Sequence, residues 1–305
     1  MMNLRTCLAS ALVMLALGGT SRSASPETNA IAASLPFEIR RGHVMIQSQL
    51  NDTDAQSFML DTGYGVTLLP PGQAEALSLR RAGRITIVGI AGEEQAGMFE
   101  GPEFDFGGLR WKPRRVAAFP TDDSSRRARH GILGSGFFKK YVVEIDPHTK
   151  RVTLRLPEEF RYAGDGEVVP LTFKDSTPIV EVIFVEASGE QVATRLELDL
   201  GCDSCLCLGR DFTEKHHLLP ADAPSSGTRS GVGGSTKTHL GRAPDLRMGK
   251  LTFSKPRANF FLDGSPVDAP LAGHIGYEML REHRLILDYS RSRLIVERAG
   301  RGKRD

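Results

Sequence analysis

This sequence has no marked excess of positive or negative charge. Its 305 residues include 39 Lys and Arg against 37 Asp and Glu, a formal net charge of +2. So balanced a chain does not indicate a nucleic-acid partner. The basic clusters also lack the interleaved aromatic residues that stack on bases. We interpret these clusters as solvated surface: Arg80-Arg81, Arg126-Arg127 and residues 301–304.

Cysteine is scarce too, at four residues. Besides Cys7 the chain holds Cys202, Cys205 and Cys207, and this odd number does not indicate a disulfide framework. With His216 and His217 nearby, the C-x2-C-x-C spacing is compatible with a metal site. Cysteine in an apolar strand often serves as a small core residue. We therefore expect no metal and no cofactor, and we retain metal binding as a third functional class.

Long apolar runs are rare as well. Residues 7–17 form one, which follows Arg5 and leads into small and polar residues up to Ser25; this is the layout of a secretory signal peptide. The run is short for a bilayer span, although the lack of a clean A-x-A site before Ser25 leaves an uncleaved membrane anchor as the alternative. We expect a soluble exported protein, periplasmic or secreted, with no further membrane contact.

Few helices are indicated between Leu35 and Arg298. Short apolar runs alternate there with Gly, Pro, Asn and Asp, a pattern typical of strands and turns. The best candidate for a short helix in the first half is Ser135–Tyr141. A chain of this length can form two domains with their own cores. The sequence therefore predicts an all-β fold. The apolar runs of the first half are H-V-M-I, F-M-L, V-T-L-L, I-T-I-V, V-A-A-F, V-V-E-I and V-T-L.

Two carboxylates stand at the ends of apolar strands. Three apolar residues, 58–60, precede Asp61-Thr62-Gly63, and a second apolar run follows. Residues 196–206 repeat the arrangement around Asp199, with Gly201 two positions on. Burial and a second acid both raise a carboxyl pKa, so such residues are either hydrogen-bonded for structure or held ready for acid/base chemistry. Two strands of this kind suggest paired carboxylates.

The same blocks occur twice along the chain in the same order. Gly231–Gly234 follows Gly89–Gly92 by 142 positions (231 minus 89), and Gly276 follows Gly134 by the same offset (276 minus 134). We interpret the blocks as two copies of one β lobe. The predicted organisation is a signal peptide (1–25), a linker (26–34), an N-terminal lobe (35–157), a connector (158–167), a C-terminal lobe (168–298) and a basic tail (299–305).

This order of D-T-G, glycine-tipped hairpin and apolar-apolar-Gly, repeated with variations, resembles the aspartic peptidase family, in particular its bacterial, exported, retropepsin-like branch. The resemblance covers about residues 35–298. It implies two retropepsin-like lobes, each a closed barrel, related by a pseudo-twofold axis. It also implies a catalytic pair, Asp61 and Asp199. Thr62, Gly63, Gly201, Gly134 and Gly276 would support the pair, and the flaps over the substrate would be Gly89, Ile90, Ala91, Gly92 and Gly231, Val232, Gly233, Gly234.

The sequence also departs from the family. Leu200 stands where a hydroxyl residue is usual, and Tyr64 and Cys202 replace a small residue after each Gly. His274 replaces an apolar residue, and for it and for His130 we expect a surface position or a hydrogen-bonded structural role. We predict an aspartic endopeptidase that acts as a monomer on peptide or protein substrates. The alternative is a peptide-binding protein that does not cleave.

Overall fold

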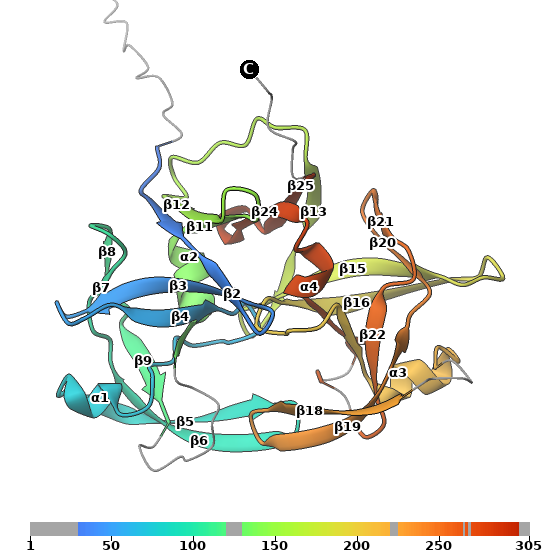
Figure 1. Ribbon diagram of the computed structural model, residues 1–305, viewed down its shortest axis with the longest axis horizontal. Helices are drawn as coiled ribbons and strands as arrows, with labels where there is room; N and C mark the ends of the chain where they lie inside the picture. Colours follow the sequence, from blue (N-terminus) through green and yellow to red (C-terminus); the bar gives the residue numbers. More distant parts are fainter. Residues whose placement is uncertain (1–29, 120–129, 220–224, 265, 268–269, 299–305) are drawn as a thin grey trace, which may run out of the picture.

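The computed structural model describes residues 30–119, 130–219, 225–264, 266–267 and 270–298. Over these ranges the chain is mostly β-strand with few helices (Figure 1), which confirms the all-β prediction. The expected helix at residue 135 is present. Within the described ranges the helices are α1 (Gln73–Ala76), α2 (Ser135–Lys140), α3 (Arg210–Lys215), α4 (Tyr277–Leu280) and a 3-10 turn, η1 (Tyr289–Arg291).

A six-stranded sheet joins the two halves of the chain, at the top of Figure 1. Its central pair is antiparallel, with Val143 opposite Leu287 and Ile145 opposite Leu285. These residues are related by the 142-residue offset, so the pairing is reciprocal. The order of strands is β1 (Ala33–Pro36), β12 (Arg151–Arg155), β11 (Val142–Asp146), β24 (His283–Asp288), β25 (Arg293–Arg298) and β13 (Glu167–Pro170).

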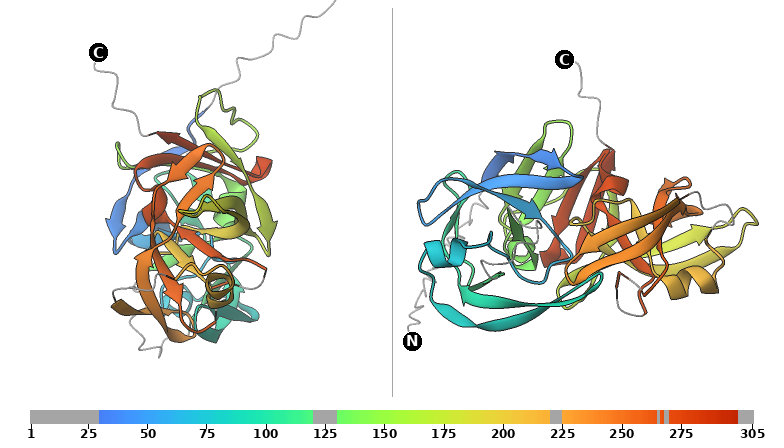
Figure 2. Two further views of the ribbon diagram at one scale, coloured as in Figure 1. Left: turned by 90° about the vertical axis from the view of Figure 1, so that its right-hand side faces the viewer. Right: turned by 60° about the horizontal axis from the view of Figure 1, so that its bottom comes forward.

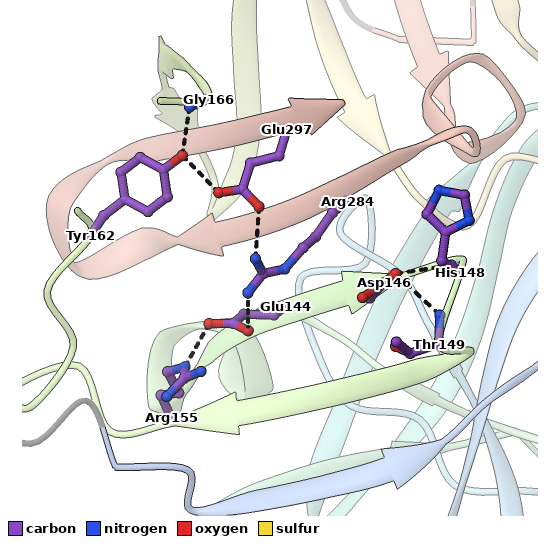
Figure 3. Close-up of polar contacts among 9 residues, drawn as sticks. All are labelled: Glu144, Asp146, His148, Thr149, Arg155, Tyr162, Gly166, Arg284 and Glu297. Carbon is purple, nitrogen blue, oxygen red and sulfur yellow. Dashed lines mark hydrogen bonds and ion pairs between the residues drawn. The ribbon is translucent and has the colours of Figure 1, made fainter. Parts of the chain in front are cut away.

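Charged side chains also connect the strands of this junction. Arg284 on β24 donates to Glu144 on β11, with 2.8 Å from Nη2 to Oε2, and to Glu297 on β25, with 2.7 Å from Nη1 to Oε2. Arg155 completes the chain of contacts at 2.5 Å from Glu144, and Tyr162 donates to Glu297 (Figure 3). Because Glu144 is buried, removal of one of its partners would leave a costly unpaired charge. The network therefore ties strands of both halves together.

The strands of the N-terminal half form two further sheets. One has the order β10 (Gly131–Leu133), β4 (Gln56–Leu60), β3 (His43–Leu50), β7 (Phe104–Asp105) and β8 (Arg110–Trp111), with β2 (Glu38–Arg40) against β3. The other has the order β5 (Arg81–Gly89), β6 (Gly92–Glu100) and β9 (Arg115–Ala118). Six of the seven predicted apolar runs lie in strands. The seventh, residues 66–69, forms only isolated bridges at Leu68.

The strands of the C-terminal half form one ten-stranded sheet. Its main order is β18 (Ser225–Gly231), β19 (Gly234–Arg242), β22 (Arg257–Phe261), β17 (Leu206–Leu208), β23 (Gly273–Gly276), β16 (Gln191–Asp199), β15 (Thr177–Val185), β20 (Asp245–Met248) and β21 (Leu251–Phe253). The tenth strand, β14 (Thr172–Lys174), pairs with β15. The parallel pair β16–β23 has the same geometry as the parallel pair β4–β10.

Closed barrels, expected from the family resemblance, are not found in the described part of the chain, where each sheet has an open order of strands. The physical reason in the N-terminal half lies after Leu69. Pro70 and Pro71 follow it, and proline has no N–H to donate to a ladder. Only Leu68 therefore bridges Ala117 of β9 and Ile132 of β10. At the equivalent place β17 has no proline and joins β22 to β23 with three residues.

The apolar core extends through both halves behind the aspartate-bearing strands. In the N-terminal half it centres on aromatic rings 5.3–6.0 Å apart, contributed by Phe58, Phe104, Phe106, Trp111 and Phe137. Burial of each large apolar side chain is worth about 1.5–3 kcal/mol, so the strand that leads to Asp61 is firmly held. Among the described residues no helix is long and apolar enough to cross a membrane.

Candidate functional site

Asp61 follows the last residue of β4 and is held by backbone contacts. Its own N–H donates to Leu133 O at 3.2 Å, and its Oδ1 accepts the N–H of Gly63 at 2.9 Å. The side chain is buried. A strand that ends in a short Gly-containing loop thus fixes one carboxyl group inside the molecule.

Asp199 is held in the same way at the end of β16. Its Oδ1 accepts the N–H of Gly201 at 2.9 Å. Asp61 makes the equivalent contact with Gly63, so in both loops the donor lies two residues after the acid. The side chain retains 18% of its exposure, so this carboxyl group is the more accessible of the two.

The two carboxyl groups meet, and each lies against the glycine of the other loop. A Cβ added to Gly63 would be 2.8 Å from Asp199 Oδ1, and one added to Gly201 would collide with the carboxyl group of Asp61. Burial first, then the charge and hydrogen bond of Asp199, hold the pKa of Asp61 well above its ordinary 3.8. Since two adjacent carboxylates repel, the pair holds one proton between them.

Thr62 connects the two loops. Its hydroxyl donates to Leu198 O at 2.5 Å and accepts the N–H of Leu200 at 2.9 Å, across 136 and 138 residues of sequence. Leu200, its counterpart in the second loop, has no hydroxyl to return these bonds. The asymmetry expected from the sequence is therefore present, and one side chain satisfies two buried backbone groups.

Thr62→Val is expected to lower the free energy of unfolding by roughly 2–4 kcal/mol, because a buried carbonyl and a buried N–H both lose their partner. Urea unfolding followed by circular dichroism measures the loss. Thr67→Val is the matched control: Thr67 is also buried, but within the described structure its Oγ1 has no hydrogen-bond partner. We expect little change there. Equal losses in the two variants would contradict this role of Thr62.

Gly134 and Gly276 lie against the backs of the two aspartate loops. A Cβ at Gly134 would be 2.6 Å from Tyr64 O, and one at Gly276 would be 2.7 Å from Cys202 O. Tyr64 and Cys202 are the equivalent residues of the two loops, so both glycines allow the same close backbone approach. Their proposed supporting position is consistent with this geometry.

The two glycine-tipped hairpins reach toward each other, at the bottom of Figure 1 and in the right-hand view of Figure 2. Ala91 N–H donates to Val232 O at 3.3 Å, and Gly233 N–H donates to Glu94 Oε1 at 2.7 Å. A Cβ at Gly231 would be 2.8 Å from Ile90 Cγ1. The described tips, residues 89–92 and 231–234, are therefore in direct contact.

His274 lies beside Asp199, with 3.7 Å between its Nδ1 and Asp199 Oδ2. It is buried, so the surface position considered for it is wrong. Burial opposes its charged form, while Cys202, Asp199 and Glu197 favour it, and the balance raises the pKa of His274. The pKa of the Cys202 thiol is raised above 9.0 by its hydrogen bond with Cys207 and by burial.

The sequence analysis did not predict that His274 lies next to Asp199. The signal in the sequence was that His274 stands where the first half has the apolar Ile132, 142 positions earlier. From the sequence, a metal site was considered at the three cysteines with His216 and His217. Within the described residues a different group comes together: the ligand atoms of Cys202, Cys207 and His274 lie within 4.8 Å of one another.

A cavity of about 220 Å³ lies on the six-stranded sheet, away from these carboxyl groups. Its lining includes Glu144, Arg155, Arg284 and Glu297 but neither Asp61 nor Asp199. These four side chains form ion pairs with one another, and these contacts explain them structurally.

Comparison with known proteins supports one family for part of the chain. The model of the aspartyl protease family matches residues 46–137, a segment that contains Asp61, the first hairpin tip and Gly134. A search of curated proteins yields no match. Asp199 and the second hairpin lie outside the matched segment. The match favours a hydrolase of the peptidase type.

Proposed function

We propose that this protein is an aspartic endopeptidase that hydrolyses peptide bonds with water activated between Asp61 and Asp199. The observation that carries the proposal is the reciprocal packing of each carboxyl group against the glycine of the opposite loop. It brings two acids 138 residues apart in sequence (199 minus 61) next to each other. Paired carboxyl groups that share a proton provide a base for water and an acid for the carbonyl oxygen.

In each reaction cycle, the carboxyl group that carries the shared proton acts as the acid and the ionised carboxyl group acts as the base. The ionised group accepts a proton from water as its oxygen attacks the peptide carbonyl, and the protonated group donates to the carbonyl oxygen. Collapse of the tetrahedral intermediate then breaks the C–N bond, and a carboxyl proton passes to the leaving amine. Because the pair titrates as a unit, neither role belongs permanently to Asp61 or Asp199.

The proposal includes two lobes of one chain related by a pseudo-twofold axis. It is supported by the reciprocal pairing of β11 with β24 and by the equivalent parallel pairs β4–β10 and β16–β23. Since one chain contributes both carboxyl groups, a monomer suffices for activity. We place the lobe boundaries at 35–157 and 168–298.

The two hairpins would act as flaps over an extended peptide. Such a peptide can add to exposed strand edges through main-chain hydrogen bonds. Because the tips, residues 89–92 and 231–234, contact each other, they must part to admit a long substrate. Their closure would then exclude water and align the scissile bond. The proposed place of action is outside the cytoplasm, on the basis of residues 1–25, which lie outside the described ranges.

The kcat/KM profile is expected to be bell-shaped with its maximum at roughly pH 4–6. Ionisation of the pair is hindered because burial and Asp199 raise the pKa of Asp61. The lower limb appears where the pair loses its first proton, and the upper limb appears where it loses its second. Initial rates on a quenched-fluorescence peptide across buffers of constant ionic strength, with a chelator present, measure the profile. A maximum above pH 8 would contradict control by this pair.

Digestion of a mixed peptide library at mildly acidic pH tests the proposal. Mass spectrometry should find internal cleavages made by the purified chain and none made by Asp199→Asn prepared in parallel. Retention of extended peptides without cleavage, by both proteins, would favour the peptide-binding alternative. Cleavage at the same rate by both would exclude the proposed site.

A further inference from the structure

Three soft metal-ligating side chains gather directly behind Asp199. Cys202 belongs to the loop that follows Asp199, Cys207 lies on β17 and His274 lies on β23. Their ligand atoms all lie within 4.8 Å of one another. Cys207 and His274 are buried, and Cys202 is partly buried. Neither the acid pair nor the flaps need these three side chains.

The sheet itself brings the group together. Cys207 and His274 are directly opposite in the antiparallel pair β17–β23, an arrangement that places two Cβ atoms about 4.5–5.5 Å apart. Asp199 is opposite Gly276 in the parallel pair β16–β23, and Cys202 follows within the same tight loop. Three separate segments of chain thus fix the positions of the ligands before any ion binds.

The N-terminal half provides an internal comparison, because its equivalent positions are apolar. Leu68 pairs with Ile132 and Ala117. In the same way, Cys207 pairs with His274 and Asn259 in the C-terminal half. Tyr64 directly follows the Gly of the first aspartate loop, and Cys202 directly follows the Gly of the second. Leu68 and Ile132 are core residues of one apolar cluster, with Tyr64 packed against it. All three positions carry metal-binding residues in the C-terminal half. A general need for core packing does not explain this joint replacement.

The spacing of the sulfur atoms fits a metal better than a disulfide. Cys202 Sγ and Cys207 Sγ are 3.8 Å apart. Two thiolates on one tetrahedral zinc ion, each with a bond of about 2.3 Å, are about 3.8 Å apart, whereas bonded sulfur atoms are separated by about 2.05 Å. We propose that Cys202, Cys207 and His274 bind one Zn²⁺ ion.

Binding is balanced by proton release. Zn²⁺ replaces the protons of the Cys202 and Cys207 thiols and the proton of the His274 imidazolium, all of which pass to solvent, and the neutral imidazole then gives its lone pair to the ion. The two thiolates neutralise the charge of the ion. Three protein ligands leave a fourth tetrahedral position open, and Asp199 Oδ2 lies 3.7 Å from His274 Nδ1. A bound ion would therefore lie close to the acid pair, and we expect it to inhibit cleavage, a consequence that rests on the proposed function.

Metal binding can be tested without any measurement of peptidase activity. The reduced, chelator-treated chain is titrated with Zn²⁺ against a chromophoric chelator, and bound zinc is counted by elemental analysis. We expect about one equivalent, with binding at least about 100-fold weaker in Cys207→Ser and in His274→Gln. Cys205→Ser is the matched control, since Cys205 is a neighbouring partly buried thiol outside the group. The affinity of Cys205→Ser for zinc should equal that of the parent chain.

Co²⁺ provides an independent readout. Bound to the chain it should show thiolate-to-cobalt charge transfer and tetrahedral ligand-field bands, which Cys207→Ser removes while its circular dichroism stays that of the parent. Well under one equivalent of zinc, or equal affinity in Cys207→Ser and Cys205→Ser, would overturn the proposal. Loss of two of the thiols Cys202, Cys205 and Cys207 in a chain purified without reductant would also overturn it, in favour of a disulfide.

Discussion

Asp199→Asn is expected to lower kcat/KM for peptide cleavage by roughly 10³-fold or more, and Asp61→Asn to do the same. An amide can neither accept the proton of the attacking water nor share a proton with its partner. Each variant keeps the shape of the side chain, and Asn Oδ1 can still accept the N–H of Gly63 or Gly201. Initial rates on one peptide, with enzyme concentration fixed by absorbance, measure the effect.

The control for this pair is Asp211→Asn, which removes an exposed carboxylate in α3. Its rate should remain that of the parent. Near-normal activity in Asp61→Asn or Asp199→Asn would mean that the two acids do not act together, and the shared-proton mechanism would have to be abandoned.

Asp61→Asn should at the same time stabilise the fold at neutral pH. Because the pKa of Asp61 is raised in the folded state, the folded protein binds this proton more tightly than the unfolded chain. The resulting stability is fully present below the ordinary pKa of 3.8 and is lost as pH rises toward the folded pKa. Since Asn carries no charge at any pH, we expect the variant to unfold at a higher temperature than the parent at pH 7. Thermal unfolding should show this gain shrinking toward pH 4.

Gly201→Ala is expected to lower kcat/KM by roughly 10²-fold, because even a small displacement of a reacting group has an effect of that size. The added methyl group would collide with the carboxyl group of Asp61, which must then move away from Asp199. Gly63→Ala should act reciprocally through Asp199, whose Oδ1 would be 2.8 Å from the new Cβ. Rates and melting temperatures measured on the same preparations separate loss of geometry from loss of fold.

Gly65→Ala is the matched control for these two substitutions. Gly65 belongs to the same loop as Gly63, but the nearest atom to a Cβ there is Asp175 O at 3.7 Å, an ordinary contact. We expect nearly full activity. If Gly65→Ala were as damaging as Gly201→Ala, general rigidity of the loop would explain both results, and the specific packing of glycine against the opposite acid would not be needed.

The sequence alone was sufficient for the features that depend on local pattern. Apolar runs separated by turn residues predicted the strands, and the 142-residue repeat indicated two copies of one β lobe. Asp61 and Asp199 stood out because an acid at the end of an apolar strand is unusual. These signals are local, since strand formation and turn chemistry involve neighbours in the chain.

Tertiary structure alone decided what residues far apart do to one another. Only the folded chain brings Gly201 against Asp61, joins the Thr62 hydroxyl to Leu198 and Leu200, and places His274 near both Asp199 and two cysteines. It also left the sheets open where closed barrels were expected; in the N-terminal half two prolines follow Leu69, next to the isolated bridges at Leu68. Distances across about 140 residues depend on how whole sheets pack, and no periodicity in the sequence encodes them.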